Sequence, residues 1–333
     1  MHVSFKALLI PSCFMLALAA AALAKSPSAI TPGHHVLEGP EVSIYNIAGE
    51  MRVVEGSGRS VEVEITPGGK DGGRLTVDLD NVKGVPTLRV VYPEDHIVYR
   101  DSYGPPHGIS SNSYLGYGGR RIHVSGSGPG LEAHADIRVL VPRGKKVNLH
   151  LAVGRAFLND VEGELRFKGA SSSVQAERVS GLLGCDVGSG EISISRCKAN
   201  ISADTGSGDI HLTEVNGNVS ADAGSGSIDL KRIFAETITL DAGSGSIDGS
   251  DIQVTVINAD CGSGSINLDG TSAEKMALDA GSGSVELHLT KNVDDLAIEA
   301  GSGSVRLTAP RELSAQFRIE CPRRNLHIDF PAE

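Results

Sequence analysis

The chain of 333 residues contains no tryptophan, and aromatic residues make up only 4% of it. A core built around large rings is therefore not expected, and Ile, Val, Leu and Ala must fill a narrow core instead. Beyond the first 24 residues, no segment approaches the roughly 18 consecutive apolar residues that cross a bilayer. We predict one long domain without a membrane span.

The one long apolar run lies at the N-terminus. Lys6 leads into a run from Ala7 that ends at Ala22-Leu23-Ala24, a pattern typical of a secretory signal with a small-residue cleavage site. We therefore expect residues 1–24 to be removed near Ala24 and the chain to be exported, whether periplasmic, secreted or associated with the cell surface. Cleavage before Cys13 would leave the following apolar stretch attached, so a lipid anchor is not expected.

Basic residues are outnumbered by acidic ones, and the formal net charge is −11. Loss of the leader removes Lys6 and no acid, which makes the exported chain one unit more negative. Such a surface repels nucleic acid and anionic lipid. A nucleic-acid partner is therefore excluded.

A phrase of Gly-Ser-Gly, a polar residue and then Ile or Val occurs seven times in the second half of the chain. The steps between copies are 18, 18, 19, 19, 19 and 20 residues, which leave no room for a helix. A near-constant period of this kind indicates stacked repeats that bury their apolar faces against one another. The copies begin at Gly188, Gly206, Gly224, Gly243, Gly262, Gly281 and Gly301.

Apolar residues alternate with polar ones on both sides of each turn. One copy has Val219, Ala221 and Ala223 before its turn, with Ile228 and Leu230 after it. Period-two alternation predicts two short strands per repeat with one face inside. Glycine is expected at the turn because it adopts positive φ without strain and because stacked backbones approach closely there.

Stacking these units in parallel at about 4.8 Å predicts an all-β, single-stranded parallel β-helix, or β-solenoid. Weaker turns near residues 154 and 171 raise the count to about nine coils of 18–20 residues, roughly 40 Å in length. A right-handed coil is the expectation, although the repeat does not itself determine the hand. The expected divisions are a linker at 25–35, irregular strands at 36–145, the regular solenoid at 146–310 and a C-terminal cap at 311–333.

The order of these motifs resembles the bacterial DUF4097 family, which is labelled adhesin-like. The resemblance rests on Val42 to Val53, then Val141-Pro142-Arg143-Gly144, then the Gly-Ser-Gly copies, and covers most of residues 36–320. It implies a β-solenoid of the bacterial envelope with no established enzymatic activity. It implies no catalytic residues, because the shared positions are turn and core positions.

An acidic residue stands two positions before every turn. Alternation places all seven on the outer face in one row, where carboxylates about 4.8 Å apart repel unless they are hydrogen-bonded, protonated or bridged by cations. They could accept N–H groups of their own turns, as in Asx-turns, or form a Ca²⁺ ladder, although the glycine-rich nonapeptide of calcium β-rolls is missing. The row comprises Asp186, Asp204, Asp222, Asp241, Asp260, Asp279 and Glu299.

Other reactive residue types fit structural positions. Cys185, Cys197 and Cys261 fall at inward positions, and Cys185 and Cys261 are four coils apart, roughly 19 Å, so free buried thiols are predicted. The repeated serines have no partnered histidine and are assigned to turns. No zinc-ligand spacing and no other cofactor motif is found.

Residues 93–130 depart from the regular pattern. They are rich in Tyr, Arg, Gly and Pro, which predicts a long loop. Tyrosine and arginine on such a loop are typical of contact surfaces, although a disordered insertion is the alternative. The candidate partner-binding residues are Tyr99, Tyr103, Tyr114, Tyr117, Arg120 and Arg121.

Three functions remain open. The first is a non-enzymatic envelope scaffold or adhesin-like surface that contacts an envelope protein, peptide or glycan. The second is an envelope-stress or peptide-sensing module. The third is a polysaccharide-acting enzyme, which is disfavoured because glycoside hydrolysis needs two converging carboxylates and these acids form one uniform row.

Overall fold

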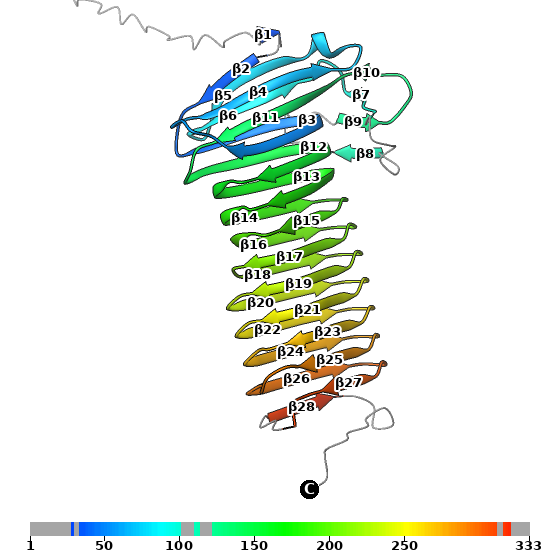
Figure 1. Cartoon of the computed structure of the whole chain (residues 1–333). Helices are drawn as coiled ribbons and strands as arrows, with labels where there is room; N and C mark the ends of the chain where they lie inside the picture. The colour runs from blue at the N-terminus through cyan, green and yellow to red at the C-terminus, as the bar shows by residue number, and fades with distance from the viewer. Residues whose placement is uncertain (1–27, 30–32, 101–109, 114–121, 312–315, 321–333) are drawn as a thin grey trace, which may run out of the picture.

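The computed structural model describes residues 28–29, 33–100, 110–113, 122–311 and 316–320 (Figure 1). Within these residues the chain is almost entirely β-strand, with a single 3-10 turn, η1, at Gly72–Arg74. No helix in this part of the chain is long and apolar enough to cross a membrane. The predicted leader and most of the predicted C-terminal cap lie outside the described residues.

The second half of the chain is a parallel β-solenoid, which confirms the predicted fold class (Figure 1). Each coil contributes one strand before its Gly-Ser-Gly turn and one after it, and each strand pairs in parallel with its equivalents in adjacent coils. The strands before the turns are β14 (Ser180–Val187), β16 (Lys198–Thr205), β18 (Val219–Ala223), β20 (Thr237–Ala242), β22 (Val256–Cys261), β24 (Lys275–Ala280) and β26 (Asp295–Ala300). The strands after them are β15 (Ile192–Ser195), β17 (Ile210–Asn216), β19 (Ile228–Phe234), β21 (Ile247–Gln253), β23 (Ile266–Thr271), β25 (Val285–Leu289) and β27 (Val305–Thr308).

Two further coils precede these, so that the solenoid has about nine. In β12 (Lys145–Asn159) and β13 (Glu162–Glu177) one long strand passes through the position of the turn without a break. The two strands pair in parallel along almost their whole length. At the other end, β28 (Gln316–Glu320) pairs with β26.

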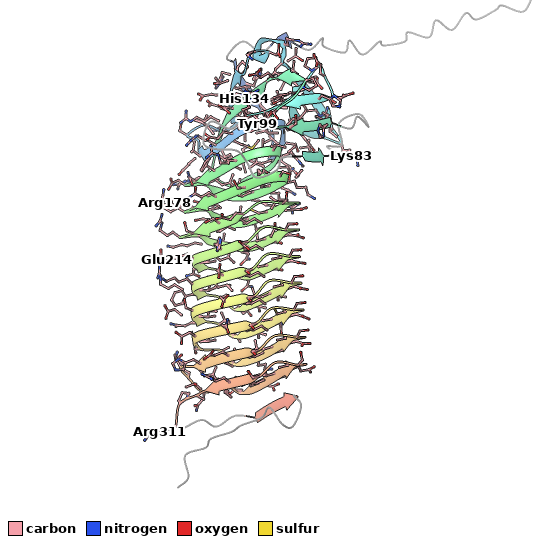
Figure 2. All side chains as sticks on the ribbon, turned by 90° about the vertical axis from the view of Figure 1, so that its right-hand side faces the viewer. Lys83, Tyr99, His134, Arg178, Glu214 and Arg311 are labelled. Atoms are coloured by element: carbon pink, nitrogen blue, oxygen red, sulfur yellow. The ribbon has the colours of Figure 1, made fainter. Side chains whose placement is uncertain are left out.

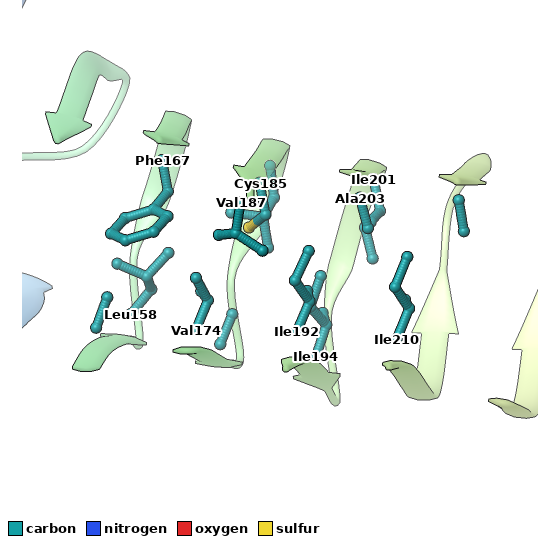
Figure 3. Close-up of a cluster of buried hydrophobic side chains, with 14 of the residues drawn as sticks. Leu158, Phe167, Val174, Cys185, Val187, Ile192, Ile194, Ile201, Ala203 and Ile210 are labelled. Carbon is teal, nitrogen blue, oxygen red and sulfur yellow. The ribbon is translucent and has the colours of Figure 1, made fainter. Parts of the chain in front are cut away.

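The core lies between the two sheets and is filled by one inward residue from every second position. Figure 3 shows Phe167, Cys185, Ile192 and Ile210 pointing into this space from successive strands. Their side chains are 0–2% exposed. The alternation read from the sequence therefore identified the core correctly.

The glycines of the turns are required by close packing and not by positive φ. All seven turns lie in the described part of the chain, and none of their glycines has positive φ, so that part of the expectation is wrong. A methyl group on Gly226 would instead overlap the carbonyl oxygen of Gly208 in the preceding coil. The same overlap recurs from coil to coil, because equivalent turns stack directly on one another.

Positive φ occurs at the opposite corner of each coil, on residues that are mostly not glycine. The φ angles there are 54–63°, and the residues are Asp160, Arg178, Arg196, Glu214, Arg232, Asp251 and Gly270. Figure 2 shows Arg178 and Glu214 along the same edge. Ion pairs join neighbouring corners, since Arg178 Nη2 lies 2.9 Å from Asp160 Oδ2 and Arg232 Nη2 lies 2.7 Å from Glu214 Oε1.

The predicted irregular strands before the solenoid are confirmed as strands, and they close its upper end in Figure 1. β3 (Glu41–Glu55) continues the parallel stack on β12, and its two halves then pair with different partners. β6 (Val85–Val91) and β11 (His134–Val141) lie on the two halves, also in parallel. Antiparallel strands follow on both sides, namely β5 (Thr76–Val82) and β1 (Ser28–Ala29) on one, and β4 (Val61–Gly68) and β2 (Gly33–Leu37) on the other.

The segment 93–130 is not simply a long loop. Its described parts contribute to a separate four-stranded sheet of β7 (His96–Val98), β8 (Ser110–Ser113), β9 (Ile122–Ser125) and β10 (Leu131–Glu132). Ile97, Val124 and Leu131 of this sheet are fully buried. The prediction of one continuous loop was wrong because the apolar strands within the segment are only three or four residues long.

Candidate functional site

The row of acidic residues forms as predicted. Each of the seven pairs with its equivalent in the next coil, from Asp186 with Asp204 through to Asp279 with Glu299. All seven side chains are exposed. We call the outer surface of the strands before the turns, β14 to β26, the ladder face.

These carboxylates do not cap their own turns, so the Asx-turn interpretation is wrong. All seven lie in the described part of the chain, and none accepts a hydrogen bond from the turn that follows it. The N–H of the first glycine of every turn is already used between coils, as are several serine N–H groups: Gly206 N–H donates to Val187 O and Ser225 N–H to Gly206 O, both at 3.1 Å. Stacking of the backbone thus removes the donors that the carboxylates would need.

The carboxylates therefore face mainly one another. Partial burial raises the pKa of Asp222, and the charges of Asp241 and Asp204 on either side raise it further. Lys168 is the exception at the upper end, since its Nζ lies 2.7 Å from Asp186 Oδ2. The row carries unneutralised negative charge along most of the solenoid.

The row continues upward through residues that the sequence pattern did not single out. Lys168 pairs in register with Asp186, His150 with Lys168, Tyr45 with His150, and Arg89 with Tyr45. The rings of Tyr45 and His150 are stacked, with centroids 4.0 Å apart and planes inclined by 2°. Counting back from Asp186 by the 18-residue period would have identified Lys168 and His150.

His150 remains neutral in this stack. Burial lowers its pKa to about 4, and the nearby charge of Lys168 lowers it further. The column of outward-facing residues that contains the acidic row therefore changes along its length from a basic and aromatic end, above the ladder face, to a purely acidic one.

A bound cation on the ladder face is not indicated by the arrangement of ligands. Among the residues the structure describes, no group of three or more His, Cys, Asp or Glu side chains is placed to hold a metal ion. Calcium prefers six to eight oxygen ligands, whereas a single column of carboxylates offers few at any one point. The Ca²⁺ ladder stays an untested hypothesis.

The outer surface of the strands after the turns has a different chemistry, and we call it the groove face. A shallow groove of about 620 Å³ crosses β17 to β27 there. Its carboxylates contact side chains of other residue types: His211 Nδ1 lies 2.8 Å from Asp229 Oδ2, and Asn267 Nδ2 donates to Asp248 Oδ1 at 2.7 Å. Sequence reasoning missed this groove, although its residues follow each turn at fixed offsets.

The candidate contact residues of segment 93–130 are placed in part. Tyr99 is only 6% exposed, and the centroid of its ring lies 5.3 Å from that of His134. Figure 2 labels both residues in the part of the chain above the solenoid. Tyr99 therefore does not offer its ring to a partner, contrary to expectation. Tyr103, Tyr114, Tyr117, Arg120 and Arg121 lie outside the described residues, and their role stays a prediction.

The three thiols that the structure describes are free and buried, as predicted. Burial raises the pKa of Cys185 to about 12, which keeps it protonated and unreactive. The sulfur of Cys261 donates a hydrogen bond to Gly245 O at 3.0 Å. These positions are therefore structural.

Comparison with known proteins supports the family resemblance for part of the chain. Residues 188–333 match the family described as Toastrack DUF4097. The resemblance is confirmed over this region, which begins at the first Gly-Ser-Gly turn and so omits the N-terminal strands expected to share it. No curated protein matches the chain.

One solved structure is similar over 84% of this chain and 100% of its own. It is described as "a putative cell adhesion protein" from Clostridium sporogenes ATCC 15579, with 10% sequence identity and a TM-score of 0.21. A likeness at that level carries no argument about fold or function.

Proposed function

We propose that this chain, whose residues 188–333 match the DUF4097 family, is an exported, non-enzymatic binding scaffold whose ladder face holds a cationic partner. The observation that supports this most directly is the row of seven exposed acidic residues paired in register. A uniform row suits an extended polymer or peptide better than a compact substrate. Adhesion to an envelope component is the corresponding role in the cell.

Charge repulsion along the row favours such a partner. Exposed carboxylates about one coil apart, near 4.8 Å, raise one another's proton affinity. The raised pKa of Asp222 follows from burial and from its two acidic neighbours. A polycation that lies along the row would relieve this repulsion and gain an ion pair at each coil it covers.

The surface beside the row leaves room for a chain. Next to the acidic residues on each strand stand short side chains, including Ser220, Thr239, Asn258 and Ala277. A shallow groove of about 360 Å³ lies along β20 to β26 at this position. A partner can therefore approach the carboxylates from the side without displacing bulky residues.

The spacing also indicates a conformation for a peptide partner. A polyproline II helix rises about 3.1 Å per residue with three residues per turn, so its equivalent side chains repeat every 9.3 Å or so. Two coils of the solenoid span about 9.6 Å. A peptide with a basic residue at every third position would match every second carboxylate, which is the form a peptide-sensing role would take.

Binding of decalysine to the full chain tests this proposal, with decaglutamate as the control peptide. We expect neutralisation of four ladder residues to weaken decalysine binding about tenfold to a hundredfold at low salt, since each exposed ion pair contributes up to about 1 kcal/mol. High salt should abolish binding by the unaltered chain. The variant carries Asp204→Asn, Asp222→Asn, Asp241→Asn and Asp260→Asn.

A matched variant controls for the loss of net charge. It neutralises four exposed acidic residues at the coil corners, Glu236→Gln, Asp251→Asn, Glu274→Gln and Asp294→Asn, which lie off the ladder face. This variant should keep most of the affinity. Equal losses in the two variants would show that only net charge matters and would contradict a site on the ladder face.

The enzymatic alternative is tested on the same variants. A polysaccharide-acting enzyme would depolymerise uronate polymers, and neutralising two adjacent ladder residues would abolish that activity. We expect no depolymerisation by any variant, because the row lacks two carboxylates converging from different elements. Activity that disappears with Asp222→Asn and Asp241→Asn would overturn the non-enzymatic role.

A further inference from the structure

The groove face carries a second concave surface whose polar groups differ in kind from those of the ladder face. The groove of about 620 Å³ runs from His211 and Thr213 at one end to His288 and Thr308 at the other. Short side chains, Asp248 and Ser250 among them, line the middle. All of these residues come from strands that follow the Gly-Ser-Gly turns.

Three carboxylates in this groove contact His or Asn side chains of neighbouring coils. His211 Nδ1 lies 2.8 Å from Asp229, Asn267 Nδ2 donates to Asp248 at 2.7 Å, and His288 Nδ1 lies 2.8 Å from Asp269. Each of these contacts engages one carboxylate oxygen. The second oxygen of each carboxylate retains its capacity to accept hydrogen bonds.

Donors and acceptors consequently lie side by side in the groove. Asp229 and Asp248 supply acceptors in one column, while Lys231 and the hydroxyl group of Ser250, two residues further along the same strands, supply donors in the adjacent column. A ligand complementary to this pattern must donate and accept at closely spaced points. Hydroxyl groups do both, whereas an ammonium group only donates.

We infer that the groove face binds a neutral, hydroxyl-rich glycan segment, with Asp248 and Ser250 at the centre of the site. Vicinal hydroxyl groups of a sugar donate to the second oxygen of Asp248 and accept from Ser250 or Lys231. The groove extends over six coils, roughly 24 Å from first to last, which is long enough for a chain rather than a single sugar. This site goes beyond the proposed function, because it lies on the opposite sheet and takes an uncharged ligand.

A printed array of neutral, acidic and amino-substituted oligosaccharides, probed with the labelled full chain, tests the inference. We expect binding to neutral glycans that persists at high salt, since no ion pair to the ligand is required. Ser250→Phe should abolish it, because the ring fills the middle of the groove. Ser220→Phe, a matched change at an exposed position of the ladder face, should leave it unchanged.

A milder substitution distinguishes loss of glycan binding from loss of folding. Asp248→Asn keeps the size of the side chain but replaces one acceptor oxygen by a donor, and we expect about tenfold weaker glycan binding. Circular dichroism and decalysine binding should be unaltered in both groove variants, which separates failure of this site from failure of the ladder face. Absence of binding to every neutral glycan, or binding that Ser250→Phe retains, would overturn the inference.

Discussion

The ladder face and the groove face belong to the same coils, yet their carboxylates have different neighbours in the adjacent coils. On the ladder face, Asp222 lies between two identical residues, and the repulsion raises its pKa. On the groove face, Asp229 contacts His211, and Asp248 accepts a hydrogen bond from Asn267, each partner coming from an adjacent coil. A column made only of acidic residues places like charges next to one another. A column of different residue types allows a side chain in one coil to contact or hydrogen-bond a carboxylate in the next.

Side-chain hydrogen bonds between coils show the same contrast. On the groove face, the hydroxyl groups of Ser227, Ser246, Ser265 and Ser284 each accept the N–H of the equivalent serine in the next coil, at 3.1–3.2 Å. On the lower ladder face the acidic column has no such links. The ladder face therefore depends on backbone pairing, while the groove face is also held by its side chains.

The strongest disruption of both faces at once should come from Gly226→Ala. A methyl group there overlaps the carbonyl oxygen of Gly208, so the coils must separate, at a cost of about 3 kcal/mol. Guanidinium unfolding should show a lowered midpoint, and both binding activities should fall together. The adjacent Ser225→Ala, at an exposed position, is the control and should change neither the unfolding midpoint nor the two binding activities.

A smaller loss should result from Ser246→Ala on the groove face. This change removes the acceptor for the N–H of Ser265, and we expect a decrease of about 1 kcal/mol in the free energy of unfolding. Ser244→Ala, at an exposed turn position two residues earlier, is the matched control. A null result for Ser246→Ala would mean that water replaces the hydroxyl group and that the groove face gains nothing from its serines.

The smallest effect should come from Asp222→Asn, and it should have the opposite sign. The folded pKa of Asp222 is raised above the unfolded value of 3.8, so stability from its protonation is present at low pH and is lost as the pH rises through the folded pKa. The substitution should therefore stabilise the chain by a few tenths of a kcal/mol at pH 7, since exposed charges are screened. The difference should vanish near pH 3.

Asp229→Asn is the corresponding change on the groove face. Asp229 contacts His211, so its replacement should not stabilise the chain at pH 7. Unfolding measured at both pH values for the two variants distinguishes the faces directly. Stabilisation of equal size by both changes would show that net charge, and not the uniform column, sets the effect.

Much of the solenoid could be predicted because the pattern that specifies it involves residues close together in the sequence. The inward positions of Cys185, Ile192 and Cys261 and the exposed row of carboxylates follow from alternation and a constant period. The conformation of the turns could not be predicted in the same way. The glycine motif suggested positive φ at Gly226, but positive φ is found at Arg196 and Glu214 on the opposite corner, where ion pairs join neighbouring coils.

The sequence by itself therefore determined the repeat, its two strands per coil, the core and the acidic row, because strand periodicity needs only neighbouring residues. Tertiary structure alone decided which residues meet across long separations. Tyr45 stacks on His150 only because β3 lies on β12, and Tyr99 is buried only because segment 93–130 adds its own sheet. Contacts between coils also decided the contrast between the two faces, since a carboxylate's partner is the residue one coil away, 18–20 positions along the chain.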